Sequence, residues 1–269
     1  KAVIAWFKRA SWDSIISAYN SGDEQQLAKL QEAMENGTTK EVYMGETFGT
    51  HYIRIANLSN SVENGCKTEV DGVEQHTSGF SETACGLVLE FADIITKHQM
   101  NPYNNNGNTN GDGSKGGWQY SEMRTYLNGS EDGTISGIIY EALPENLRNK
   151  IIPTTVVSGH GGNDSANFTT TDKLYLLSTA EVWEGTSASL NNDTARDKTR
   201  QLDYYKKKGV TTSNYSDVIK QNNGLNTWWL RSAISGRNDY YFNVNLRGDW
   251  NADPSNCTLG VSPAFRISN

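Results

Sequence analysis

Two apolar segments near the C-terminus enclose a stretch of very different composition. The first runs from Trp228 to Ala233 and the second from Gly260 to Ile267. Residues 235–259, between them, are rich in Tyr, Asn, Asp, Ser and Gly and contain no Lys or Glu. Aromatic rings give a large contact area at low side-chain entropy cost, and small polar residues give adaptable hydrogen bonds. The composition is typical of a recognition surface held between two rigid segments, and a twisted hairpin with polar turns fits it equally well.

Length and composition favour one folded domain. The chain has 269 residues, 36% of them hydrophobic, with seven Trp and thirteen Tyr. This is enough apolar surface for a sizeable core, which argues against a disordered chain. The length fits one large domain or two small ones, but no internal repeat or linker divides the sequence. We therefore predict a single α+β domain over residues 1–269.

Charge and hydropathy exclude two classes of partner. The formal net charge is -7, and long Lys/Arg runs are absent from the sequence. Because nucleic-acid affinity comes mainly from neutralising phosphates, we do not expect nucleic acid as a partner. The basic cluster at 206–208 is predicted to be a solvated helix end. No stretch approaches the roughly 20 apolar residues that span a bilayer, and residues 1–7 are too short for a secretory signal, so no membrane insertion is expected.

Cysteine and histidine spacings do not predict a metal site. Cys66, Cys85 and Cys257 show no CxxC spacing, which argues against both zinc and a disulfide framework. A disulfide between Cys66 and Cys85 stays open as an alternative. The histidines lack HxH or HxxxH spacing and are predicted to be structural. They are His51, His76, His98 and His160.

Periodicity predicts alternating helical and extended segments. Helices are expected as two elements within 11–35, and at 121–127, 143–151 and 179–183. Extended structure is expected as a hairpin within 40–58, a strand at 87–91 and a buried strand at 173–178. Long irregular segments are expected at 101–117 and at 187–223, the latter as a polar insertion.

The Asn/Gly-rich segment 101–117 partly matches a calcium loop. Asn106, Asn108 and Asn110 fit the first ligand positions of an EF-hand, and Gly111 fits its sharp turn. The twelfth position is then Gly117, where a bidentate Glu is needed. We predict a solvent loop, with no metal ion.

Catalytic motifs are not found. The sequence contains no GxSxG elbow and no Walker A loop, and Gly161-Gly162 after His160 lacks a strand-then-helix context. Asp71 and Glu74 stay open as a glycosidase pair, because their separation in space cannot be read from sequence. We predict that the chain is not an enzyme and uses no cofactor.

Six motifs occur in the order found in one family. They are Gly116-Gly117-Trp118 with Ser121 and Met123-Arg124, Leu127-Asn128, Leu143-Pro144, Lys173–Ser178 with Glu181, Trp228–Ser232 and Gly260–Ile267. From about Trp12 to the C-terminus the chain resembles a bacterial and phage family of C-type-lectin-fold domains. The resemblance implies short twisted antiparallel strands, two main helices and long irregular loops. Residues 1–37 would form a helical N-terminal part, and 228–267 a variable, ligand-binding region.

Some members of that family are variable proteins of diversity-generating retroelements. There an error-prone reverse transcriptase rewrites adenines, above all in AAC and AAT codons, which never yields Lys, Glu, Gln, Met or Trp. Within 235–259 only Trp250 departs from that set. The resemblance implies a fixed scaffold made of Gly236, Asn243, Val244, Asn245, Gly248, Gly260, Val261, Pro263, Ala264 and Phe265. It implies variable ligand-binding residues Ile234, Arg237, Asn238, Asp239, Tyr240, Tyr241, Leu246, Arg247, Asp249, Trp250, Asn251, Ala252, Asp253 and Pro254.

The sequence thus predicts a ligand-binding protein whose C-terminal surface is diversified, displayed on a phage tail or a bacterial cell surface. Tyr240, Tyr241 and Trp250 would be the aromatic anchors, and Arg231 is expected to pair within the scaffold. The partner would be a macromolecule, a protein on a host or neighbouring cell. Two alternatives stay open: a non-diversified structural or adhesive module, and an oxidase like the formylglycine-generating enzymes. The oxidase ranks last, because those enzymes use a pair of nearby cysteines and Cys257 stands alone in its region.

Overall fold

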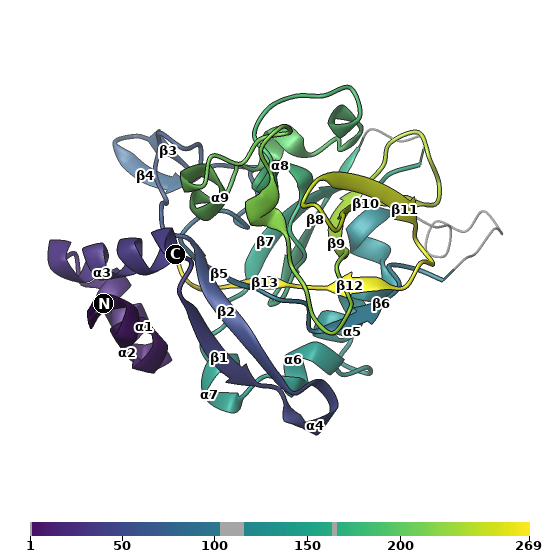
Figure 1. Ribbon diagram of the computed structural model, residues 1–269. Coiled ribbons are helices and arrows are strands. Elements are labelled where there is room, and N and C mark those ends of the chain that lie inside the picture. Colours follow the sequence, from purple (N-terminus) through teal and green to yellow (C-terminus); the bar gives the residue numbers. More distant parts are fainter. Residues whose placement is uncertain (1, 103–115, 163–165) are drawn as a thin grey trace.

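The computed structural model describes residues 2–102, 116–162 and 166–269, and it has a mixed α+β fold (Figure 1). The calcium candidates Asn106, Asn108 and Asn110 lie outside the described residues. One contiguous core of buried apolar side chains extends from Phe7 to Ile267 and joins the helical N-terminal part to both larger sheets.

Three helices form the N-terminal part: α1 (Ala2–Arg9), α2 (Trp12–Asn20) and α3 (Glu24–Glu35). The two helices predicted within 11–35 are confirmed, and each begins at a side-chain cap. Ser11 Oγ accepts from Ser14 N at 3.1 Å, and Asp23 Oδ1 accepts from Gln26 N at 3.0 Å. Such caps satisfy N–H groups that have no partner in the first turn of a helix. Helix α1 was not predicted from periodicity, although it lies within the 1–37 segment that the resemblance implied to be helical.

The first sheet is antiparallel, with strand order β1-β2-β5-β13. Its strands are β1 (Thr39–Tyr43), β2 (Thr50–Asn57), β5 (Leu87–Phe91) and β13 (Ala264–Ser268). The predicted hairpin at 40–58 is confirmed, with the short helix α4 (Gly45–Phe48) at its turn. All of β5 is buried. Strand β13 belongs to the second apolar segment near the C-terminus, so this segment packs into the core as a strand of the first sheet.

The second sheet carries the C-terminal segment, with strand order β11-β10-β9-β12-β6. Its strands are β6 (Thr96–His98), β9 (Trp228–Ala233), β10 (Tyr240–Val244), β11 (Trp250–Pro254) and β12 (Leu259–Val261). The pairing is antiparallel except between β9 and β12. Strand β9 is buried along its whole length, so the first apolar segment holds the centre of the sheet.

Two small hairpins and several short helices complete the fold. The strands are β3 (Lys67–Val70), β4 (Val73–His76), β7 (Thr154–Gly159) and β8 (Asn167–Asp172). The α-helices are α5 (Glu122–Asn128), α6 (Ile138–Ala142), α7 (Glu145–Arg148), α8 (Thr179–Val182) and α9 (Asp203–Lys207). The 3-10 turns are η1 (Gly117–Tyr120), η2 (Leu190–Asn192), η3 (Arg196–Lys198) and η4 (Ser216–Val218). The hairpin β3–β4 protrudes beside the N-terminal helices in Figure 1.

Two predicted segments differ from the structure. The run 173–178 is buried as expected but is not a strand, because it pairs through a single bridge between Tyr175 and Ala264. A capping box of Ser178 and Glu181 then begins α8 directly. The polar insertion 187–223 is less irregular than predicted. It contains α9 and three 3-10 turns, and Tyr205 and Lys220 lie in the core.

Lys220 is buried because a carboxylate neutralises it. Its Nζ lies 3.2 Å from Glu90 Oε2 and 4.0 Å from the centre of the Trp228 ring. Arg54 and the Tyr205 hydroxyl bond the same carboxylate. Burial lowers the pKa of Lys220 to about 8, partly offset by the charge of Glu90. This cluster ties the 187–223 segment to the first sheet.

Cys66 and Cys85 form a disulfide at the base of the β3–β4 hairpin, so the alternative left open by the sequence is realised. Both cysteines are buried. None of the helices in the described part of the chain has the length and apolarity required to cross a membrane.

Candidate recognition surface

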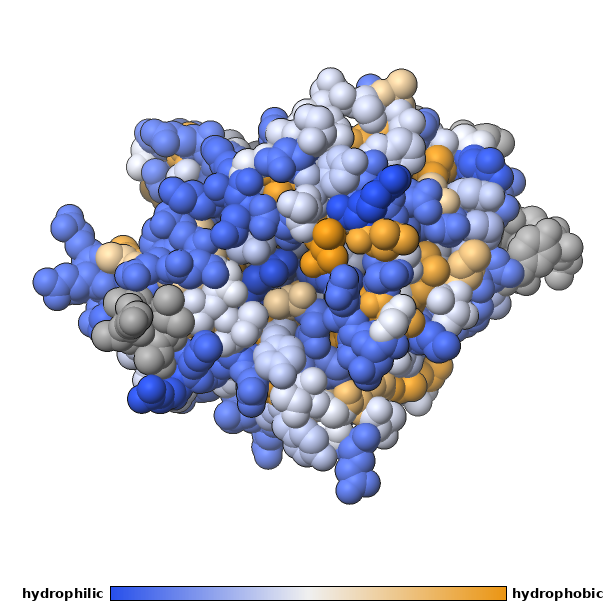
Figure 2. Space-filling model, in the orientation of Figure 1, coloured by the Kyte–Doolittle hydropathy of each residue, from blue (hydrophilic) through white to orange (hydrophobic). Residues whose placement is uncertain are grey.

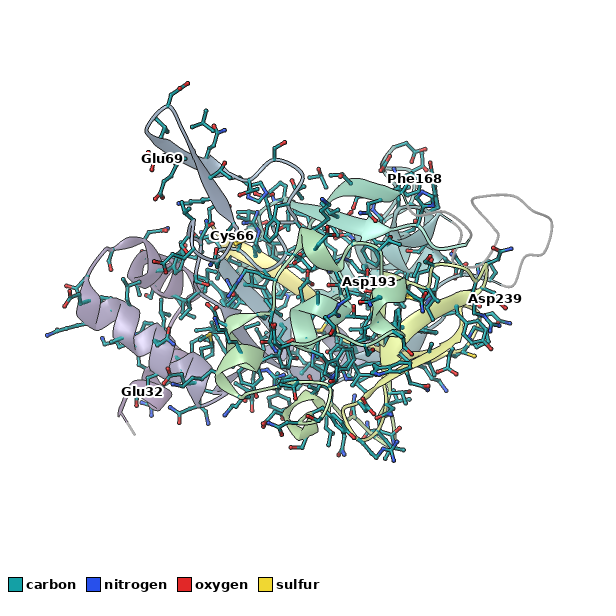
Figure 3. The ribbon with its side chains drawn as sticks, turned by 90° about the horizontal axis from the view of Figure 1, so that it is seen from above. Glu32, Cys66, Glu69, Phe168, Asp193 and Asp239 are labelled. Atoms are coloured by element: carbon teal, nitrogen blue, oxygen red, sulfur yellow. A yellow bond between two sulfur atoms is a disulfide. The ribbon has the colours of Figure 1, made fainter. Side chains whose placement is uncertain are left out.

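The segment predicted to bind ligand forms the outer part of the second sheet. It comprises a loop at 234–239, strand β10, a turn at 245–249 and strand β11, and we call its exposed side the β10–β11 surface. Figure 2 shows apolar side chains gathered among polar ones in the region of these strands. Figure 3 shows Asp239 at the periphery of the molecule and Asp193, which is buried, near the centre of the view. In Figures 1 and 3 this surface lies at the opposite end of the molecule from the β3–β4 hairpin.

Most of the predicted variable residues carry accessible side chains. Leu246 is 57% exposed, and its position at the tip of the turn explains why an apolar side chain is left in solvent. The residues that are exposed or half-buried are Arg237, Asn238, Asp239, Tyr240, Leu246, Arg247, Asp249, Trp250, Asn251, Ala252, Asp253 and Pro254.

Tyr241 and Ile234 do not belong to this surface. Tyr241 is fully buried, its ring packs edge-on against Trp229, and its hydroxyl accepts a hydrogen bond from Asn101 Nδ2 at 3.4 Å. Burial raises the pKa of Tyr241 well above its usual range. Successive side chains of a strand point to opposite faces, so Tyr240 and Tyr241 cannot both reach the same ligand. Ile234, 9% exposed, also packs into the core. The interpretation of Tyr241 as an anchor is corrected.

Asp253 is accessible but also structural. Its Oδ2 accepts from Asn243 Nδ2 at 2.8 Å and from Asn251 Nδ2 at 3.3 Å. Asn243 is buried, so removing this acceptor would leave its amide without a partner. Asp253 therefore tolerates change less well than its neighbours on β11.

Backbone atoms hold the loop at 234–239. Arg237 O accepts from Gly162 N at 2.8 Å, and Asp239 O accepts from Ser255 N at 2.6 Å. Both bonds use carbonyl groups that any side chain at 237 or 239 would leave in place. The side chains themselves face outward, with Arg237 54% and Asp239 40% exposed.

The turn at 245–249 is held in the same way. Oδ1 of Asn245 accepts from Arg247 N at 2.9 Å and from Asp249 N at 3.1 Å. Gly248 has φ +87°, and a Cβ there would lie 2.0 Å from Tyr215 O. Its carbonyl accepts from Trp183 Nε1 at 3.1 Å. Residues predicted to be scaffold thus fix the turn, and Leu246 and Arg247 contribute only backbone.

The exposed groups are aromatic and charged. The guanidinium of Arg237 lies 3.8 Å from the centre of the Tyr240 ring and 3.6 Å from Asp239 Oδ1. Trp250 packs edge-on against Phe242, which positions its ring at the boundary between core and solvent. Arg, Tyr and Trp are the residues most often found at the energetic centres of protein interfaces.

Strand β11 is an edge of the sheet, and its outer edge offers few hydrogen bonds. The bonds from Ser255 N to Asp239 O and from Asn245 N to Asp249 O show which residues of the two strands form hydrogen-bonded pairs. In an antiparallel pair every second residue is bonded to the partner strand, and the residues between point their backbone groups outward. The backbone groups of Trp250, Ala252 and Pro254 then point away from β10. Proline lacks an N–H, and Trp250 N donates to Asp249 Oδ1. A partner strand would therefore find little backbone to pair with along this edge.

Beneath the surface, polar side chains join β9 to α8. Arg231 forms a buried pair with Glu181, which confirms its predicted scaffold role. Asp193 Oδ2 accepts from Thr179 Oγ1 and Ser232 Oγ, each at 2.6 Å. These bonds fix the strand from which the 234–239 loop departs.

The groups considered for catalysis lie on separate elements of the fold. Asp71 and Glu74 lie on the exposed β3–β4 hairpin, Asp71 at its tip. Cys257 is partly exposed, and burial together with Asp253 raises the pKa of its thiol, which disfavours the reactive thiolate. His51 bonds Asp93, and His98 stacks on Tyr126. Across residues 2–102, 116–162 and 166–269, no group of three or more His, Cys, Asp or Glu side chains is arranged to hold a metal ion.

Comparison with known proteins gives one match. A family model described as a domain of unknown function (DUF6273) covers residues 89–269. The chain belongs to the DUF6273 family. The DUF6273 match begins within β5 and contains the whole β10–β11 surface, whereas the N-terminal helices and the β3–β4 hairpin precede it. Neither the curated proteins nor the solved structures contain a match to this chain.

Proposed function

We propose that this protein recognises a macromolecular target through the β10–β11 surface, and that a retroelement diversifies the surface. The target is a protein on a host or neighbouring cell, and the chain acts on a phage tail or a bacterial cell surface. The scaffold is a C-type lectin fold. The mixed α+β architecture, with short antiparallel strands and long connections, is compatible with that fold.

One observation carries the proposal: the 234–239 loop and the 245–249 turn are held by main-chain atoms and by buried or scaffold residues, not by the exposed side chains of Arg237, Asp239 and Leu246. Main-chain carbonyls at 237, 239 and 248 accept the anchoring bonds, and Asn245 fixes the turn. A surface built in this way keeps its backbone when its exposed residues change. A surface fixed by its own side chains would lose its shape with each substitution.

The chemistry of the exposed groups favours a protein target. An apolar or acidic patch of a partner can bury the side chains of Tyr240, Trp250 and Arg237. The charges of Asp239 and Arg247 can determine which charged partners are favoured. The disulfide between Cys66 and Cys85 supports an exported protein, because such bonds persist in oxidising compartments.

Sequencing of the encoding locus in independent isolates is the first test. We expect a near-identical repeat beside a reverse transcriptase, with differences confined to adenines. The differing codons should encode exposed residues such as Tyr240 and Asn251 and should spare the buried Tyr241. An isolate series in which the repeat and the transcriptase are both missing would contradict diversification.

A display library tests recognition independently of the locus. Arg237, Asn238, Asp239, Tyr240 and Asn251 are randomised together, and binders to a purified test protein are selected. We expect binders from this library, and we expect them to lose affinity when the selected residues are reverted.

A matched control library randomises Glu69, Val70, Val73 and Glu74, exposed residues of the β3–β4 hairpin at the other end of the molecule. Equal recovery of binders from the two libraries would argue against a specialised surface. A fixed adhesive module is the second candidate, favoured by the structural roles of Tyr241 and Asp253. Identical 234–254 sequences in all isolates would support it.

A further inference from the structure

A polar groove lies between η1, helix α5 and the loop that follows this helix. Its volume is about 570 Å³, within the range of small-molecule sites. It is separate from the β10–β11 surface in sequence. Its lining residues are Gln119, Tyr120, Ser121, Arg124, Thr125, Gly129, Ser130, Glu131 and Asp132.

Arg124 is locked in the wall of this groove. Its Nε donates to Asp172 Oδ1 at 2.7 Å, and Nη1 donates to Glu131 Oε1 at 2.9 Å and to Gln119 O at 3.2 Å. Asp172 is itself fixed, since its Oδ2 accepts from Trp118 Nε1 at 2.9 Å. Within the described residues no hydrogen bond uses Nη2 of Arg124, so a rigid donor is left for a ligand.

Two further groups favour a ligand with both apolar and hydroxyl surface. The Tyr120 ring is 41% exposed and is held edge-on by Phe168, labelled in Figure 3, at 5.4 Å between ring centres. Gln119 Oε1 is buried without a hydrogen-bond partner among the described residues. A buried acceptor without a partner is rare, and a rotation of the Gln119 side chain toward the groove would let a ligand hydroxyl satisfy it.

The charge of the groove decides between ligand classes. Arg124 is already paired with Asp172 and Glu131, and Asp132 adds another carboxylate. Hydrogen bonds from Ser130 and Thr134 lower the pKa of Asp132 to about 2, so this carboxylate is ionised at neutral pH. An excess of negative charge repels phosphates, sulfates and acidic sugars.

We propose that this groove binds a neutral saccharide. The C–H face of a sugar ring stacks on Tyr120, and vicinal hydroxyls bond Arg124, Gln119 and Glu131. Each hydroxyl both donates and accepts, which suits a wall where donors and acceptors alternate. The site uses no metal ion and none of the residues of the β10–β11 surface.

The experiment is an NMR titration of the ¹⁵N-labelled chain with maltose, cellobiose, lactose and chitobiose, each to about 50 mM, well above a millimolar Kd. We expect at least one disaccharide to give saturable shifts confined to residues 119–132. Tyr120→Ala should weaken that binding about tenfold, and Tyr120→Phe, which keeps the ring, should change it less than about threefold.

Tyr43→Ala is the matched control, because Tyr43 is an exposed tyrosine on β1 outside the groove, and it should leave binding unchanged. The proposal is overturned if none of the disaccharides gives saturable shifts, or if the shifts map outside residues 119–132. Glucuronate and its neutral counterpart glucose are titrated in the same way, and tighter binding of glucuronate would also overturn it. Because Tyr120 is exposed and lies outside the hydrophobic core, its variants are expected to fold, and unchanged amide spectra verify this before titration.

Discussion

Arg231 and Glu181 form a fully buried, two-point ion pair beneath the β10–β11 surface. Nη1 of Arg231 lies 2.6 Å from Glu181 Oε1, and Nη2 lies 2.7 Å from Oε2. Hydroxyls of Thr83 and Thr199 also donate to Oε2, so the carboxylate is well satisfied. The pair links β9, which leads into the 234–239 loop, to helix α8.

Breaking this pair should cost about 3–5 kcal/mol of unfolding free energy, because one charge is left buried without its partner. Arg231→Leu is the substitution, and urea denaturation is the measurement. Arg237→Leu, at an exposed position, should change the free energy of unfolding by less than about 1 kcal/mol. Similar losses in the two variants would contradict the assignment of Arg231 to the scaffold.

The exposed residues should tolerate simultaneous change. In a chain with Arg237, Asp239, Tyr240 and Asn251 all replaced by Ala, we expect the unfolding free energy to fall by no more than about 1–2 kcal/mol. Tyr241→Ala should cost about 3–5 kcal/mol, since it removes a fully buried ring. Chemical denaturation of both variants decides, and a larger loss in the quadruple variant would sink the separation of surface from scaffold.

Two glycines of the segment provide a matched pair. Both have positive φ, +83° at Gly236 and +87° at Gly248, so Ala at either position carries backbone strain of about 1 kcal/mol. At Gly248 the added Cβ also meets Tyr215 O at 2.0 Å, whereas at Gly236 nothing lies within 4 Å. Gly248→Ala should therefore cost at least about 2 kcal/mol more than Gly236→Ala in thermal or urea unfolding. Equal losses would argue against the close contact.

His51 should make stability depend on pH. Its Nδ1 lies 2.9 Å from Asp93 Oδ2 and its Nε2 2.6 Å from Phe48 O. Burial lowers the pKa of His51, but the hydrogen bond and charge of Asp93 with the Phe48 carbonyl outweigh it, and the pKa is raised. A raised folded pKa gives stability that is present below the unfolded pKa of about 6.5 and is lost as pH rises through the folded pKa.

We therefore expect the unfolding free energy to decrease as pH rises above about 6.5, and His51→Gln to flatten this dependence. Urea denaturation across neutral pH measures it, with the imidazole titration followed by NMR. A slope that persists in His51→Gln would assign the effect to other groups.

The disulfide should be a real contributor to stability. Cys66 and Cys85 are 19 residues apart, and closing a loop of this size typically stabilises by about 3 kcal/mol. Replacing both by Ala should lower the unfolding free energy by roughly that amount, and Cys257→Ala, at a free and partly exposed cysteine, by less than about 1 kcal/mol. Mass spectrometry of alkylated protein, with and without reductant, verifies the pairing.

Local patterns predicted those elements whose signals are local. The helical patterns within 11–35 and at 121–127 and the alternation at 40–58 correspond to α2, α3, α5 and the β1–β2 hairpin. The two apolar C-terminal segments are buried as expected. Each of these depends on neighbours within a few residues along the chain.

The remaining features depend on partners far away in sequence. The run 173–178 has the apolarity of a strand, but the capping box that follows leaves it one bridge instead of a ladder. A lysine such as Lys220 is expected at the surface, and it is buried here because Glu90, 130 positions away in the sequence, supplies its counter-charge. The composition of 235–259 predicted a surface but could not separate Tyr240 from Tyr241, because strand register decides which of two adjacent side chains faces inward.

Pro254 and the capped N–H of Trp250 affect how copies of this protein behave when they lie close together. An exposed sheet edge is a template for polymerisation with any neighbouring chain, and changing residues around it would repeatedly create new aggregation-prone variants. Here the obstacle consists of the Pro254 ring and of the Asp249 side chain that caps Trp250 N, and both stand at positions predicted to vary. A variant that lost both would expose a pairing edge on β11, so the density at which copies stay apart would differ from one variant to the next.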